Sequence, residues 1–361
     1  MFEEISHAIQ NKDYNQASRL IKKLRLTNAK NPWLDFYTAQ LYEVKGKQKE
    51  AKKVYNYLLK NIINPQLTRK IRQRLEAIKQ EKIAKKENAI ALAKSQIGEE
   101  KGLFILEAIP KEKKQIASQR FGKIMEIDAY TARLQIPSRS WRLYRIGNIG
   151  EFSYYVKVLN KAGIPCFCIP ISKLKKLSVS QIKYIETVTS KVKVICENSE
   201  GKEERLTFHW SEISKRVEAL VPIFTQSFQF GVNREIYNTQ EFLDYNQLCD
   251  LYLPKRKKIL RFCDQQYNFK KGINFFDNYE LDNSLNQTIT TRQNWNQFLK
   301  FIQQQLPNIP IYSEFNFFGE TALDYKEFLK EINPNINVFR QQPSLWDQAF
   351  HLYSNLAFLK P

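Results

Sequence analysis

A recurrence at 34 residues near the start of the chain constrains its fold more than any other feature. Ala17 is followed 34 positions later by Ala51, within the similar segments 13–17 and 46–51. The same spacing joins three more pairs on the expected inner faces: Ala8 with Tyr42, Ile21 with Tyr55 and Leu24 with Leu58. Residues 1–66 are therefore predicted to form two similar pairs of helices.

This pattern resembles the tetratricopeptide repeat, a 34-residue pair of helices. In the second copy, the small and large positions of that family fall on Ala39, Tyr42, Gly46, Ala51, Tyr55 and Leu58. The first copy departs from the pattern, because Lys12 stands where the second copy has Gly46, and Ile5 where it has Ala39. The resemblance implies stacked helical hairpins with a concave groove that binds a protein or peptide.

The residue types suit close helix packing. Alanine at a helix crossing lets two backbones approach, while tyrosine and leucine one turn away fill the groove between them. Gly46 ends a helix because glycine accepts the left-handed conformation without penalty. Such units need a stacked neighbour, and residues 67–79 would supply a capping helix. The alternative is an ordinary helical hairpin domain whose period is accidental.

The net charge of +20 favours acidic partners: nucleic acid, anionic lipid surfaces or acidic proteins. Residues 1–101 hold 22 basic against 11 acidic residues, and the much longer remainder holds 35 against 26. The first part is therefore the more basic one. Four lysines crowd one face of the predicted connector helix: Lys79, Lys82, Lys85 and Lys86.

The sequence predicts a soluble, cytoplasmic protein without a secretory leader or a membrane span. Phe2 is followed by two glutamates rather than by positive charge, and no apolar run approaches about 18 residues. The five cysteines are odd in number, and four lie in apolar segments, so reduced buried thiols are preferred over disulfides. Cys166 and Cys168 share a strand face but have no second pair at zinc-ligand spacing.

The remaining chain predicts an α+β multidomain fold. Residues 102–172 alternate strands and helices like a small α/β sandwich, one strand short of a ferredoxin-like module. Residues 173–275 predict an antiparallel sheet or barrel. Residues 276–361 combine a polar insert at 277–291 with helices over 295–306, 321–332 and 344–359. We expect the last helix to be core rather than a partner-binding face.

Common catalytic patterns are absent from the sequence. It lacks the glycine-rich phosphate loops and the Gly-x-Ser-x-Gly elbow, and its three histidines have no ligand or base spacing. Glu314, Glu320 and Asp324, with Lys326 nearby, suggest a magnesium-dependent hydrolase as a weak alternative. The simpler interpretation places these acids near the positive end of a helix dipole. No cofactor or resident metal is expected.

A second set of residues would suit nucleic acid. Arg139, Trp141, Arg142, Tyr144 and Arg145 interleave charge with aromatic rings, and Lys255, Arg256, Lys257 and Lys258 form a basic turn. In a strand, however, alternate side chains point to opposite faces, and neither face of 139–145 is purely basic. One face is therefore expected to pack in the core.

We predict a non-enzymatic adaptor or scaffold that binds a protein or peptide through its helical repeats. The candidate residues for an acidic partner segment are basic: Arg19, Lys22, Lys23, Lys45, Lys52 and Lys53. The remaining domains would form a second interaction surface or a platform. Binding of RNA or single-stranded DNA is the alternative, and the metal-dependent hydrolase is the weaker one.

Overall fold

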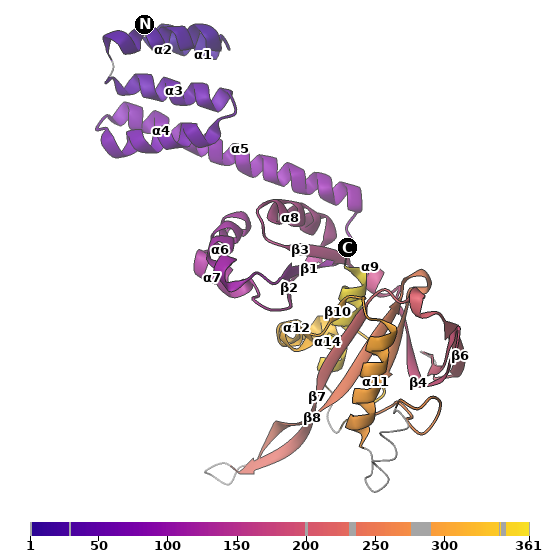
Figure 1. Ribbon diagram of the computed structural model, residues 1–361. Coiled ribbons are helices and arrows are strands. Elements are labelled where there is room, and N and C mark those ends of the chain that lie inside the picture. The colour runs from indigo at the N-terminus through magenta and orange to yellow at the C-terminus, as the bar shows by residue number, and fades with distance from the viewer. Residues whose placement is uncertain are drawn as a thin grey trace. The chain divides into compact units, whose positions relative to one another are not determined.

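The structure is a computed structural model with two compact units, residues 1–92 and 93–361 (Figure 1). It describes residues 2–28, 30–198, 201–230, 236–275, 290–338, 340 and 344–360, without the side chains of 226–240. The order of elements confirms the expected class, with helices first and then sheets mixed with helices. The predicted polar insert at 277–291 lies outside the described residues as far as 289.

The first unit is helical. Its elements are α1 (Phe2–Gln10), α2 (Tyr14–Thr27), α3 (Pro32–Val44), α4 (Gln48–Asn61) and α5 (Pro65–Ile97), whose last five residues belong to the second unit. Local chemistry sets the boundaries, since the Asp13 carboxylate accepts a 2.9 Å hydrogen bond from Gln16 N at the start of α2. Asn31 caps α3, and Pro32 takes the first helical position, where its missing N–H costs nothing.

The second unit begins with a three-stranded antiparallel sheet in the order β2-β1-β3. Its elements are β1 (Lys101–Glu107), α6 (Lys111–Met125), α7 (Ala129–Gln135), β2 (Trp141–Asn148), α8 (Ile149–Lys161), β3 (Cys166–Pro170) and α9 (Ile171–Leu174). All three strands fall where the alternation in the sequence predicted them. The sheet has three strands, so the ferredoxin-like arrangement of four is not formed.

A seven-stranded sheet follows, in the order β10-β7-β8-β9-β4-β5-β6. Its strands are β4 (Ser178–Val188), β5 (Val192–Glu197), β6 (Glu203–Phe208), β7 (Arg216–Phe230), β8 (Ile236–Leu253), β9 (Lys258–Cys263) and β10 (Ile311–Tyr312). The expected all-antiparallel sheet or barrel is wrong, because β4 pairs in parallel with β9, β10 in parallel with β7, and the strand order is open.

The last helices differ partly from prediction. They are α11 (Thr291–Gln305), α12 (Phe315–Ala322), α13 (Lys326–Lys330) and α14 (Trp346–Leu359), with a 3-10 turn at Leu323–Tyr325. The predicted helices over 295–306 and 344–359 correspond to α11 and α14. The single helix predicted over 321–332 is wrong, since α12 starts earlier and the turn separates it from α13.

Side-chain packing arranges the second unit in alternating layers of helix and sheet (Figure 1). Helix α11 covers one face of the seven-stranded sheet, where Trp295, Phe298 and Ile302 are fully buried. Helices α12 and α14 cover its other face and also one face of the three-stranded sheet. Phe104 on the remaining face of the three-stranded sheet contacts Phe152 of α8.

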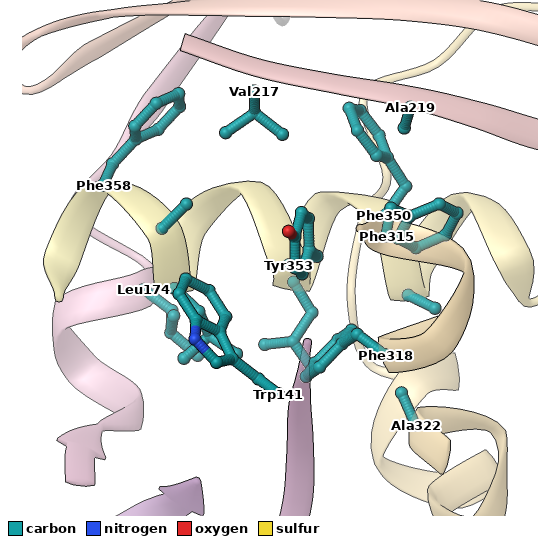
Figure 2. Close-up of a cluster of buried hydrophobic side chains, with 14 of the residues drawn as sticks. Trp141, Leu174, Val217, Ala219, Phe315, Phe318, Ala322, Phe350, Tyr353 and Phe358 are labelled. Atoms are coloured by element: carbon teal, nitrogen blue, oxygen red, sulfur yellow. The ribbon is translucent and has the colours of Figure 1, made fainter. Parts of the chain in front are cut away.

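Helix α14 is the centre of this packing, as Figure 2 shows. Trp141 of β2 approaches it from one side, and Val217 and Ala219 of β7 approach it from the other. Every α14 residue from Ala349 to Phe358 is buried. A helix that is apolar around most of its circumference belongs inside a large core, which confirms the sequence-based expectation for this segment.

A polar cluster interrupts this otherwise apolar contact. Asp250 of β8 and Arg261 of β9 are cross-strand neighbours, with side chains 0% and 1% exposed. Arg261 Nε and Nη2 donate to the two Asp250 carboxylate oxygens at 2.9 and 2.7 Å. Ser354 Oγ of α14 donates to Asp250 Oδ2 at 2.6 Å, so the ion pair fixes the helix on the sheet.

Removal of one partner of this pair should strongly destabilise the second unit. In Asp250→Ala the Arg261 charge stays buried without compensation, and we expect the free energy of unfolding to fall by about 3–5 kcal/mol. Arg205→Ala is the control, because Arg205 is 61% exposed and its pair with Glu186 is worth less than about 1 kcal/mol. Urea unfolding measures both variants, and equal losses would contradict the assigned role.

The buried His351 should make the protein sensitive to acid. Burial, and then repulsion from Arg261, lowers the pKa of His351 to about 3. The unfolded chain binds this proton below about pH 6.5 and the folded chain does not, so stability decreases as pH falls from 6.5 towards 3. Between pH 7 and pH 5 we expect wild type to lose roughly 1–2 kcal/mol more than His351→Gln.

Urea unfolding at the two pH values tests this difference. Asp264 acts in the opposite direction, because burial raises its pKa to about 6 and its ionisation costs stability as pH rises from about 4 to 6. That contribution is common to both proteins, so it cancels in the comparison. Identical pH profiles for wild type and His351→Gln would show that His351 is not buried in its neutral form.

Candidate protein-interaction site

The small residues of the 34-residue pattern lie inside the first unit. Ala17, Ala39 and Ala51 are 0% exposed and Ala8 is 5% exposed. Tyr55 and Leu58 are buried beside them, whereas Tyr42 is half-buried at the edge of the same core. The side chains expected to pack between helices therefore do so, with α2 and α4 occupying equivalent places in the two copies.

The turns inside the two hairpins repeat the same hydrogen bonds 34 residues apart. Asp13 N donates to Ala8 O at 2.8 Å, and Lys47 N donates to Tyr42 O at 2.7 Å. Lys12 has a φ of 63° and Gly46 a φ of 73°, so both occupy the left-handed position that ends the first helix. The first copy therefore keeps the turn geometry although its sequence lacks the glycine.

One carboxylate links three helices of the unit. Glu43 of α3 accepts hydrogen bonds from Tyr55 Oη of α4 and from Arg74 of α5, whose Nη2 lies at 2.5 Å. The Glu43 side chain is only 9% exposed. Burial, with the neighbouring Glu43 as the next cause, raises the pKa of Tyr55, so its hydroxyl remains a donor. This interaction joins α5 to the hairpin of α3 and α4.

An aromatic contact between α3 and α5 was not found by sequence reasoning. The Lys70 ammonium of α5 lies 5.0 Å from the ring centroid of Trp33 of α3. Trp33 also contacts Phe36 and Tyr37 of its own helix, with ring centroids 5.9 and 6.2 Å apart. The signal in the sequence was the aromatic cluster 33–37, which the 34-residue comparison did not weigh.

The six predicted partner-binding residues do not line one groove. Arg19, Lys22 and Lys23 lie on α2, Lys52 and Lys53 on α4, and Lys45 at the end of α3. Helical geometry places the α2 cations opposite the buried Ala17, Ile21 and Leu24. All six are exposed except Lys52, which is half-buried.

The solvent-facing stripes of α2 and α4 share a composition. On α2 the three cations are followed by Leu26, which is 89% exposed. On α4 the stripe contains Lys53, Lys60 and Tyr57, which is 62% exposed. Each second helix thus presents cations together with one large exposed apolar side chain, and we call these two stripes the α2 and α4 stripes.

The structure separates the residues proposed for nucleic-acid binding. Trp141 is buried in the core, so it offers no stacking surface. Arg142 Nη1 donates to Leu134 O at 3.1 Å, Arg145 lies over the ring of Tyr144, and Arg139 lies over Phe317. These side chains belong to β2 and the segment before it.

The basic turn after β8 is partly neutralised. Arg256 pairs with Glu212 at 2.8 Å, and Lys258 pairs with Glu204 at 3.3 Å. Lys255 and Lys257 are exposed. The turn therefore offers two cations in place of the four that the sequence suggested.

The acidic residues proposed for a metal site are not assembled as expected. Glu314 Oε2 accepts a hydrogen bond from Ser140 N at 2.9 Å. Glu320 lies on α12, but that helix ends at Ala322, so Asp324 does not share a helix face with it. Across the described ranges, no group of three or more His, Cys, Asp or Glu side chains has a metal-binding arrangement.

The five cysteines are free thiols, and four of them are buried. Burial raises the pKa of Cys249 and Cys263 to about 12, which keeps both thiols protonated and unreactive. This confirms the expectation of reduced, buried cysteines.

Comparisons with known proteins give no relative. No family model, no curated protein and no solved structure matches the chain. Within the described part of the chain, no helix is both long and apolar enough to cross a membrane. The physical features of the two units are therefore the basis for assigning a function.

The turn geometry predicts a stabilising substitution. Lys12→Gly relieves the left-handed backbone of a non-glycine residue, and we expect the first unit to gain up to about 1 kcal/mol. Lys47→Gly is the control, because Lys47 has a φ of −86° and gains nothing from glycine. Thermal unfolding followed by circular dichroism measures both, and a loss in Lys12→Gly would contradict the turn assignment.

Proposed function

We propose that the chain is an adaptor whose first unit binds an acidic segment of another protein. The observation that carries this proposal is the composition of the α2 and α4 stripes, which combine exposed cations with Leu26 and Tyr57. An acidic segment containing an apolar or aromatic side chain complements both features. The resemblance to tetratricopeptide repeats agrees with this role but places the partner in a groove.

The charge of the first unit supports an acidic partner. Residues 1–92 hold 20 lysines and arginines against 9 aspartates and glutamates. Several of the acids are already paired within the unit: Asp35 with Arg25 at 2.7 Å, Glu43 with Arg74, and Glu81 with Lys85 at 2.5 Å. The basic excess therefore lies outward, where it attracts a partner of opposite charge.

Exposed aliphatic side chains favour a protein over a nucleic acid. Leu26 and Ile63 are among the most exposed large apolar side chains of the described chain. An aliphatic side chain contributes apolar area to a protein interface but offers a base no stacking surface. The buried position of Trp141 also weakens the nucleic-acid alternative.

Fluorescence anisotropy with two labelled probes tests the proposal on the full chain. The first probe is a 12-residue peptide of glutamate and aspartate with two leucines, and the second is a single-stranded RNA of 12 nucleotides. We expect the peptide to bind more tightly at moderate salt. The triple variant Arg19→Gln, Lys22→Gln, Lys23→Gln should weaken peptide binding at least about tenfold, since three charge contacts are lost.

A charge-matched variant controls for net charge alone. Arg72→Gln, Lys79→Gln, Lys82→Gln removes three exposed cations from α5 and should change the peptide affinity much less. Leu26→Asn should weaken the peptide without reducing RNA binding. Equal losses in the two triple variants, or tighter binding of the RNA, would contradict the proposal.

A further inference from the structure

A pocket of about 320 Å³ lies beside α14 in the second unit. It is formed by α9 and the residues after it, by α13 and the segment after it, and by α14. Its apolar walls include Leu174, Phe328 and Leu352. The volume is near the lower end of the range of about 300–1,000 Å³ for small-molecule sites, which suits a ligand the size of an amino acid.

Two residues of this lining carry buried polar atoms without a partner. His351 is 7% exposed and Asn355 is 2% exposed, and they lie one turn apart on α14. Asn355 Nδ2 contacts His351 Nε2 at 3.0 Å, and an amide nitrogen can only donate. His351 Nε2 therefore accepts, and the neutral ring carries its hydrogen on Nδ1.

This arrangement leaves one unused donor and one unused acceptor. His351 Nδ1 and Asn355 Oδ1 have no hydrogen-bond partner in the described structure. Buried polar groups are nearly always paired, so an unpaired donor and acceptor on adjacent turns indicate a missing ligand group. That group must accept one hydrogen bond and donate another.

The pocket lining also carries one cation and one anion. Lys175 follows α9 and Glu331 follows α13, and both side chains are exposed. Neither side chain forms an ion pair with any other described residue. A ligand with both a carboxylate and an ammonium group would match these charges as well as the two unused polar atoms.

We propose that this pocket binds a free hydrophobic amino acid. The ligand carboxylate accepts from His351 Nδ1–H and pairs with Lys175. The ligand ammonium donates to Asn355 Oδ1 and pairs with Glu331. The apolar side chain of the ligand lies against Leu174, Phe328 and Leu352.

Isothermal titration calorimetry with the full chain tests the head group directly. Four probes share a phenyl ring: L-phenylalanine, 3-phenylpropanoate, 2-phenylethylamine and 3-phenylpropanamide. The amide satisfies the unused donor and acceptor but carries no charge, so it separates the hydrogen bonds from the ion pairs. We expect phenylalanine to bind at least about tenfold more tightly than each of the other three.

Substitutions locate the binding site. Glu331→Gln and Lys175→Gln should each weaken phenylalanine binding at least about fivefold, and Asn355→Leu should abolish it. Glu327→Gln and Lys176→Gln remove neighbouring exposed charges outside the pocket and should leave the affinity unchanged. The two rim variants change exposed side chains, so their far-ultraviolet circular dichroism should match wild type.

Three results would overturn the proposal. They are no heat of binding with any of the four probes, equal affinity for the amide and for phenylalanine, and phenylalanine binding that persists unchanged in both rim variants. Because the pocket lies within the second unit, none of these results bears on binding of the acidic peptide by the first unit.

Discussion

The ion pair between Asp250 and Arg261 gives direction to a core that is otherwise held by non-directional apolar contacts. Hydrophobic burial would tolerate α14 in several rotations or registers on the sheet. The hydrogen bond from Ser354 to Asp250 allows only one of them. Arg261 Nη1 also donates to Pro334 O at 2.5 Å, so the same pair holds the segment that approaches α14. Since each buried charge depends on its partners, the cluster is retained or lost as a whole.

Because α14 lies between two sheets, the second unit depends on the end of the chain. The three-stranded sheet, built from residues 101–170, and the strands β7 to β9 bury apolar faces against the same helix. Each sheet would otherwise expose one of these faces to water, at about 25 cal/mol for every Å² of apolar surface. The segments predicted as 102–172, 173–275 and 276–361 therefore form one compact unit. Such long-range contacts close large loops and slow the folding of the unit.

The sequence predicted local features well and non-local ones poorly. The period of 34 residues located the helices and their buried alanines, because helix packing depends on neighbouring turns. Strand β8 was missed, since its first half is polar and its pairing with β7 is long-range. The stripe cations were named, but the exposed positions of Leu26 and Tyr57 became apparent only once the helices were placed. The pocket beside α14 collects segments up to 184 positions apart, from Ile171 to Asn355, which no spacing rule connects.

The charges of the first unit are divided between two tasks. Its paired acids serve inward or between neighbouring helices, where Glu43 joins α3, α4 and α5 through Tyr55 and Arg74. This use leaves the cations of α2 and α4 without enough acids to neutralise them. Self-repulsion among these cations costs some stability, and an acidic partner would remove that cost on binding. Binding and folding of the unit should therefore reinforce each other, because the ligand stabilises only the folded arrangement of stripes.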